Sequence, residues 1–219
     1  METDQANSRI QPRTEAEDEM TIIAHRINTI EELQELPPDY GVEIDIRAYN
    51  GRLILSHDPY QDGEALEEFL AEVGNRFVVF NIKESGIEDD VVDLAARYEV
   101  TEYFLLDVEF PYIYAASRES SFGKMAIRFS EAEPLAAAIE NADFVDWVWV
   151  DTNTQLPLHR NNYRKLSEAG YRICLVSPGR WGRPEDIDPY ISTLQNEGIN
   201  IDAVMTSTDN AEKWKRYWS

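Results

Sequence analysis

The stretch Val42-Glu43-Ile44-Asp45-Ile46 alternates apolar and acidic residues, a pattern typical of a β-strand. Successive side chains of a β-strand point to opposite faces of the sheet, so the two carboxylates share one face. An exposed edge strand would give the same pattern, but we expect this stretch to be the second strand of a closed barrel, which has no free edge. A buried acidic face is costly unless a cation or base lies opposite it. Glu43 and Asp45 are therefore candidate ligands of one hard cation.

Around this stretch, short apolar runs alternate with segments of helical periodicity. Runs such as Val78-Val79-Phe80 are typical of parallel strands that are buried on both faces. Strands are expected at Thr21–His25, Gly41–Ala48, Arg76–Lys83, Tyr103–Glu109, Lys124–Phe129, Phe144–Asp151, Arg172–Ser177 and Ile201–Thr206. Helices are expected at Ile30–Glu35, Gly63–Val73, Glu88–Tyr98, Glu131–Asn141, Asn161–Ala169, Asp186–Asn196 and, closing the chain, Trp214–Ser219. This alternation predicts an α/β protein with a single (β/α)8 (TIM) barrel, because open doubly wound sheets usually have only about five to seven strands.

The chain of 219 residues is expected to form one domain. Residues 1–19 are polar and acidic, and we expect a disordered tail there, before a barrel domain over residues 20–219. Asn50-Gly51-Arg52 predicts a hairpin turn. The short extra strand that follows, Leu53–Ser56, would carry His57 back toward the mouth of the barrel.

Acidic residues outnumber basic ones by 42 to 20, which gives a formal net charge of −22. A field of this sign repels nucleic acid and anionic membranes, so a phosphate-bearing substrate would need a local pocket with cations or a metal ion. No apolar run approaches the roughly 20 residues of a membrane span. The N-terminus lacks an apolar signal core, so a cytoplasmic location is expected. The single cysteine, Cys174, excludes an intramolecular disulfide.

Two histidines and two cationic residues lie at or just beyond the ends of expected strands. His25 and Arg26 follow the first strand, His57 precedes Asp58 after the hairpin, and Lys83 ends the third strand. Catalytic residues of a TIM barrel gather at these carboxyl ends. Histidine is suited to proton transfer, and arginine and lysine neutralise phosphate charge, so these side chains are candidates for a site that acts on a phosphate ester.

Further polar residues at later strand ends are expected at the same mouth: Asp107, Glu109, Arg128, Glu131, Asp151, Thr152 and Ser177. Trp149 alternates with Asp151 along its strand, so both are expected to face the pocket. We predict that they form part of the pocket wall, with Trp149 against an apolar part of the substrate.

The order of these motifs resembles that of the glycerophosphodiester phosphodiesterase family, one of the phospholipase C-like phosphodiesterases built on a (β/α)8 barrel. The matching motifs are His25-Arg26, Glu43-Ile44-Asp45, His57-Asp58 and Asn81-Ile82-Lys83. The resemblance implies that His25 and His57 are the acid–base pair and that Arg26 and Lys83 contact phosphate. It also implies that Glu43 and Asp45 bind a divalent cation, Mg²⁺ or Ca²⁺.

The chain departs from the family pattern at several positions. The third family carboxylate, two residues before the lysine, is Asn81 here, which can coordinate a cation through its carbonyl oxygen but brings no charge. Ile27 stands where the family has glycine, and the Glu-Asn-Thr segment is shortened to Ile27-Asn28-Thr29. The small subdomain that the family inserts after the His-Asp motif is absent, so we expect a more open pocket.

These motifs predict a metal-assisted phosphodiester hydrolase that acts on glycerophosphodiester-like or related small phosphodiesters, with the oligomeric state left open. A degenerate barrel that binds a phosphorylated ligand without cleaving it is the main alternative, because Asn81 replaces a carboxylate. An isomerase or aldolase with Lys83 as a Schiff-base nucleophile is a further possibility. An amidohydrolase would need a His-x-His pair on the first strand, whereas His25 stands alone.

The excess of acid, with only five lysines, resembles the surfaces of proteins from salt-loving organisms, and it predicts that salt stabilises the fold. Raising KCl from about 0.05 M to about 2 M should raise the Tm by roughly 5 °C or more, because counterions screen the self-repulsion. Differential scanning calorimetry measures this, with sucrose of equal osmolality as the control. A Tm that is independent of salt would contradict the prediction.

Overall fold

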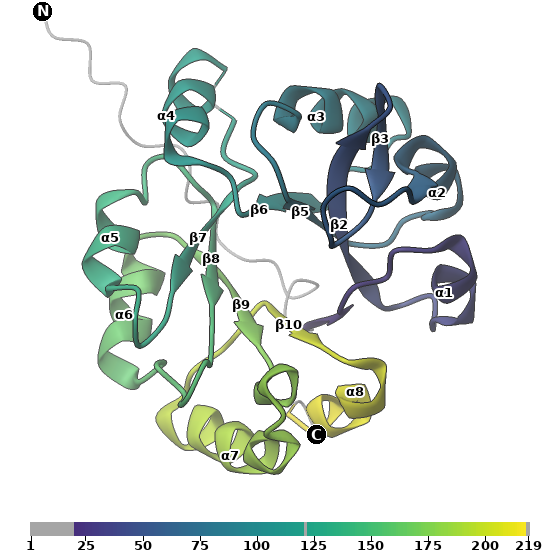
Figure 1. The fold of residues 1–219 in the computed structure, drawn as a ribbon. Coiled ribbons are helices and arrows are strands. Elements are labelled where there is room, and N and C mark those ends of the chain that lie inside the picture. The colour runs from purple at the N-terminus through teal and green to yellow at the C-terminus, as the bar shows by residue number, and fades with distance from the viewer. Residues whose placement is uncertain (1–19, 121, 218–219) are drawn as a thin grey trace, which may run out of the picture.

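The computed structural model describes residues 20–120 and 122–217, so the predicted tail over residues 1–19 lies outside the described residues. In the described part of the chain, parallel strands alternate with helices, and the helices surround the ring of strands (Figure 1). The barrel strands are β1 (Thr21–Ala24), β2 (Gly41–Tyr49), β5 (Val78–Ile82), β6 (Tyr103–Leu106), β7 (Ala126–Phe129), β8 (Trp147–Val150), β9 (Arg172–Val176) and β10 (Ala203–Thr206). The helices are α1 (Ile30–Glu35), α2 (Leu66–Glu72), α3 (Glu88–Arg97), α4 (Phe110–Glu119), α5 (Leu135–Glu140), α6 (Arg160–Glu168), α7 (Ile187–Glu197) and α8 (Thr208–Lys215).

The strands close into a barrel. β1 pairs in parallel with β2 on one side and with β10 on the other, and the sheet continues through β5 to β6 and through β9 and β8 to β7. The two ends meet at an isolated parallel bridge between Leu105 and Met125, where the Leu105 N–H donates to the Lys124 carbonyl oxygen at 2.9 Å. The predicted (β/α)8 barrel is therefore confirmed.

Alternate side chains of every barrel strand except β2 fill the interior of the barrel with apolar and aromatic groups. The cluster contains Ile23, Val79, Phe104, Leu106, Ala126, Trp147, Trp149, Cys174, Val176, Ala203 and Met205. Phe104 lies at its centre, with its ring centroid 4.8 Å from that of Trp147 and 5.8 Å from that of Phe77. This packed layer lies inside the barrel, directly below the polar carboxyl ends of the strands.

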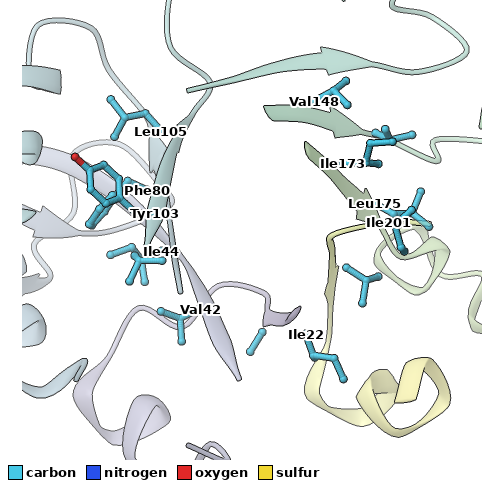
Figure 2. Close-up of a cluster of buried hydrophobic side chains, with 14 of the residues drawn as sticks. Ile22, Val42, Ile44, Phe80, Tyr103, Leu105, Val148, Ile173, Leu175 and Ile201 are labelled. Atoms are coloured by element: carbon cyan, nitrogen blue, oxygen red, sulfur yellow. The ribbon is translucent and has the colours of Figure 1, made fainter. Parts of the chain in front are cut away.

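The other face of each strand packs against the surrounding helices. Figure 2 shows Val42 and Ile44 of β2 with Phe80 of β5 in this outer layer, which is buried throughout. Because Ile44 points outward, its neighbours Glu43 and Asp45 point into the barrel, where both are almost completely buried. The face of β2 predicted to be acidic is therefore an interior face.

A hairpin leaves the barrel after β2. Its turn residues Asn50 and Gly51 have φ angles of 51° and 78°, the left-handed conformation that an Asn-Gly turn favours. The returning strand β3 (Arg52–Leu55) pairs antiparallel with the end of β2, and β4 (Glu64–Ala65) pairs with β3. The predicted hairpin is confirmed, and it brings residues 56–58 to the end of β2.

One helix of the structure was not predicted, and one predicted helix has other bounds. Helix α4 was not predicted, because Pro111 and the aromatic residues around it give a weak helical pattern. The closing helix begins at Thr208 rather than Trp214, because the chain turns directly from β10 into α8. Trp214 is fully buried and donates from Nε1 to Ser177 Oγ at 3.0 Å, which fastens this helix to the loop after β9.

None of the helices in the described residues is long and apolar enough to cross a membrane.

A substitution at Phe104 tests how much the apolar interior layer stabilises the fold. The substitution Phe104→Ala should lower the free energy of unfolding by about 3–5 kcal/mol, because it removes buried aromatic contacts and leaves a cavity. Urea unfolding measures this, and Phe110→Ala is the matched control because Phe110 is 52% exposed on α4. Equal effects of the two substitutions would contradict the described core.

Candidate active site

A cavity of about 450 Å³ opens at the carboxyl ends of the barrel strands. Its wall includes most of the residues that the sequence predicted for the site, namely His25, Glu43, Asn81, Lys83, Trp149 and Asp151. Arg26, Asp45 and His57 lie beside this group but do not line the cavity. Residues from both the first and the second half of the barrel therefore line one cavity.

His25 directly continues β1, and its backbone N–H donates to the Thr206 carbonyl oxygen at 2.9 Å. Its Nε2 lies 2.9 Å from Nη1 of Arg180 and 3.9 Å from Oε2 of Glu43. A guanidinium can only donate, so Nε2 is the accepting nitrogen of a neutral imidazole. Burial and the positive charges of Arg180 and Arg26 lower the pKa of His25 to about 4. His25 is therefore uncharged at neutral pH, and its Nε2 lone pair accepts the hydrogen bond from Arg180.

Both carboxylate oxygens of Glu43 accept hydrogen bonds from the protein. Oε2 accepts the Arg26 backbone N–H at 2.8 Å, and Oε1 accepts Nδ2 of Asn81 at 2.7 Å. The left-handed backbone of Arg26, with φ of 57°, allows this residue to present its N–H inward while its side chain remains exposed. Burial and the nearby Asp45 carboxylate raise the pKa of Glu43.

Asn28 holds Asp45 through a pair of hydrogen bonds. The Asn28 amide donates to Asp45 Oδ2 at 2.9 Å, and the Asp45 backbone N–H donates to Asn28 Oδ1 at 2.9 Å. Lys83 Nζ lies 3.0 Å from Asp45 Oδ1 as an ion pair, and 4.0 Å from Asp107. Ile27-Asn28-Thr29, the shortened family segment, therefore still supports the acidic strand.

The acidic end of β2 offers oxygen ligands that suit a cation. Asp45 and Asn81 are opposite each other in the register of β2 and β5. Oδ1 of Asn81 is buried without a hydrogen-bond donor, and Oδ1 of Asp45 is buried against the Lys83 ammonium. With a Glu43 oxygen beside the Asn81 amide, this donor set is of the type that hard divalent cations prefer. In residues 20–120 and 122–217, no three or more His, Cys, Asp or Glu side chains are grouped to hold a metal ion, so such a site would depend on the Asn81 amide oxygen.

His57 lies on the loop after the hairpin, beside Arg26. Its Nε2 is 2.6 Å from Nη2 of Arg26, and its Nδ1 is 2.8 Å from Oδ1 of Asp58. Since Arg26 donates, the imidazole carries its proton on Nδ1 and donates it to Asp58, whose pKa is lowered by this contact. Arg47 donates to the His57 carbonyl oxygen at 3.1 Å, which anchors the loop to β2.

The opposite wall of the cavity is formed by a charged group centred on Arg128. Arg128 donates from Nε to Asp107 at 2.7 Å and from Nη1 to Asp151. Burial raises the pKa of Asp151, although Arg128 opposes this effect. The Nε1 of Trp149, on β8 just before Asp151, is buried and has no hydrogen-bond acceptor. The predicted pocket wall thus combines an aromatic ring with a polar network.

Sequence reasoning missed Arg180. It lies in the short 3-10 helix η2 (Pro178–Trp181) after β9, in a loop whose sequence carries no catalytic motif. The only local signal is Pro178-Gly179, which predicts a turn at the mouth of the barrel. Its contact with His25, 155 residues away in the sequence, exists only because the barrel closes between β10 and β1.

No protein-family model matches the chain, and neither does any curated protein sequence. Solved structures do match it. A glycerophosphoryl diester phosphodiesterase from Parabacteroides distasonis aligns over 91% of this chain and 87% of its own, with a TM-score of 0.62 and 12% identity. A phosphodiesterase from Oleispira antarctica, solved with sn-glycerol-3-phosphate, aligns over 91% and 97%, with a TM-score of 0.63 and 15% identity.

A phosphoribosyl anthranilate isomerase from Thermus thermophilus also aligns over 91% of this chain and 98% of its own, with a TM-score of 0.53 and 14% identity. Enzymes of two reaction classes therefore share this architecture, and an activity must be argued from the residues of the site. At these identities the likeness establishes the fold alone, in agreement with the (β/α)8 barrel described above.

Proposed function

We propose that this chain is a phosphoric diester hydrolase that acts on small phosphodiesters, including those of the glycerophosphodiester type. The observation that carries the proposal is the grouping of a neutral His25, the Glu43–Asp45–Asn81 oxygens and Lys83 around one end of a cavity. The fold neighbours support it, since one of them was solved with a glycerol phosphate product.

Lys83 and Arg26 are proposed to bind the phosphate oxygens of the substrate. Lys83 faces the cavity, and Arg26 reaches the same end of the barrel from β1. Both would neutralise the negative charge on the phosphate oxygens as the nucleophile attacks. Lys83 pairs with the carboxylates of Asp45 and Asp107, an arrangement that suits a charge-neutralising ammonium better than the free amine of a Schiff base.

His25 is proposed as the general base. Its Nε2 is an acceptor in the described geometry and lies at the cavity wall, so it can take a proton from water or from a neighbouring substrate hydroxyl. His57 is proposed as the general acid that protonates the leaving alkoxide. Asp58 fixes the proton on Nδ1 of His57 and would stabilise the imidazolium needed for this role.

A divalent cation, Mg²⁺ or Ca²⁺, is proposed to bind Glu43, Asp45 and Asn81. When bound, it would supply Lewis-acid stabilisation of the phosphate oxygens. The chain's own residues prepare the site, because Asn28 and the Arg26 backbone fix the two carboxylates before any ligand arrives.

Non-catalytic binding of a phosphorylated ligand is the second candidate function. It is favoured by one observation, the neutral Asn81 in the place of a third carboxylate. The two functions differ in turnover, which the following experiment measures.

Purified protein should hydrolyse bis(p-nitrophenyl) phosphate with added Mg²⁺ or Ca²⁺, and chelator should abolish turnover. The substitutions His25→Ala and His57→Ala should each lower kcat/KM by about 10²–10⁴-fold, because each removes a proton-transfer group. His159→Ala is the matched control, since His159 is exposed at the start of α6 and should leave turnover unchanged. Folded protein that shows no turnover with any metal would favour the binding function instead.

Asn81→Asp tests the cation site without any assay of activity. The new carboxylate should tighten Mn²⁺ or Ca²⁺ binding by roughly tenfold or more, because it adds a charged ligand beside Glu43 and Asp45. Without metal the variant should be less stable, since a third buried acid lacks a counterion. Isothermal titration calorimetry and the metal-dependent Tm measure both effects, with Asn81→Ala as the control. Unchanged affinity would place the cation elsewhere or exclude it.

A further inference from the structure

Arg180 contacts His25 at the atom that the proposed chemistry uses. Its Nη1 lies 2.9 Å from His25 Nε2, and its guanidinium lies 5.2 Å from the centroid of the Trp181 ring. Both Arg180 and Trp181 are exposed and line the cavity. The guanidinium therefore covers the lone pair of the proposed base from the solvent side.

Arg180 has no carboxylate partner, unlike the other cations of the cavity wall. Lys83 is paired with Asp45, and Arg128 with Asp107 and Asp151. Within the described ranges no Asp or Glu oxygen lies within 4.0 Å of an Arg180 nitrogen. Arg180 is close enough to Asp151 for its charge to lower the pKa of that carboxyl, but it forms no ion pair with it. In a chain with 42 acidic residues against 20 basic ones, a guanidinium that faces a cavity without an ion pair is suited to an anionic ligand.

We infer that Arg180 is a phosphate-binding residue that rests on His25 Nε2 in the free protein and moves onto a phosphate oxygen when the substrate binds. This inference rests on the proposed phosphodiesterase function. The exchange is favourable because a phosphate group brings an opposite charge and can accept two parallel N–H bonds from a guanidinium, whereas neutral His25 Nε2 accepts one and brings no charge. The same movement uncovers Nε2 of His25 only when a phosphate group is present.

The position of Arg180 in the barrel fits this role. β9 and β10 are the seventh and eighth barrel strands, and the loops after these strands often form the phosphate site of a TIM barrel. Arg26 makes the equivalent contact with the second histidine, since its Nη2 donates to His57 Nε2. Each proposed proton-transfer nitrogen is thus covered by one arginine in the free protein.

The variants Arg180→Gln and Arg180→Lys test the inference, with Arg164→Gln as the control. Arg164 is exposed on α6 and pairs only loosely with Glu168, at 3.8 Å. Calorimetry should find that Arg180→Gln weakens the binding of dimethyl phosphate and of inorganic phosphate by about tenfold or more, and that Arg180→Lys has an intermediate effect. With bis(p-nitrophenyl) phosphate, KM should rise by a similar factor. Crystals of the wild type with and without dimethyl phosphate should show the guanidinium on phosphate and on His25, respectively.

Binding of both anions that is unchanged in Arg180→Gln would overturn the inference, as would a wild-type protein that binds neither anion. A loss confined to kcat would also overturn it, because that result indicates that Arg180 only positions His25. Hydrolysis by the wild type would leave the proposed function intact in each of these cases. If instead no diester is hydrolysed but anion binding depends on Arg180, the proposed function fails and the phosphate site stands.

Discussion

The burial of Glu43 and Asp45 inside a closed barrel is the constraint on which the site depends. Two carboxylates on one strand, both almost fully buried, need hydrogen-bond donors or cations to offset the free-energy cost of removing their charge from water. The four compensating groups come from two segments: the Arg26 backbone and the Asn28 amide follow β1, and the Asn81 amide and the Lys83 ammonium lie at the end of β5. Each of these groups is thereby fixed in position at the mouth of the barrel, and the geometry of the site follows from that need.

The apolar core and the polar site occupy different levels along the barrel axis. The aromatic layer around Phe104 fills the interior below the site, and the carboxyl ends of the strands carry polar groups above it. The tightly packed layer gives the strand ends a rigid support, and the hydrogen bonds among the polar side chains then fix their positions. The hairpin after β2 adds His57 without disturbing the ring, since β3 pairs with residues 46–49 of β2, beyond the residues Gly41 and Val42 that pair with β1.

The two histidines of the site differ in burial and in their hydrogen-bond partners. His25 is largely buried between Glu43 and Arg180, whereas His57 is on a more exposed loop with Asp58 as its partner. Environments that separate two like groups in this way are typical of acid–base pairs. The asymmetry arises from position, because one histidine extends a barrel strand and the other follows an external hairpin.

Local patterns in the sequence determined the fold and about half of the site. Alternation in Val42-Glu43-Ile44-Asp45-Ile46 identified the acidic interior face, and the apolar runs identified the other strands, because strand periodicity and burial on both faces are local properties. The Asn50-Gly51 turn likewise followed from local backbone preference. Tertiary structure alone decided that Arg180 covers His25, that Arg128 bridges Asp107 and Asp151, and that His57 lies beside Arg26 rather than in the cavity wall. These contacts join residues on different strands and loops, and no local pattern encodes them, because they depend on how the ring of strands closes.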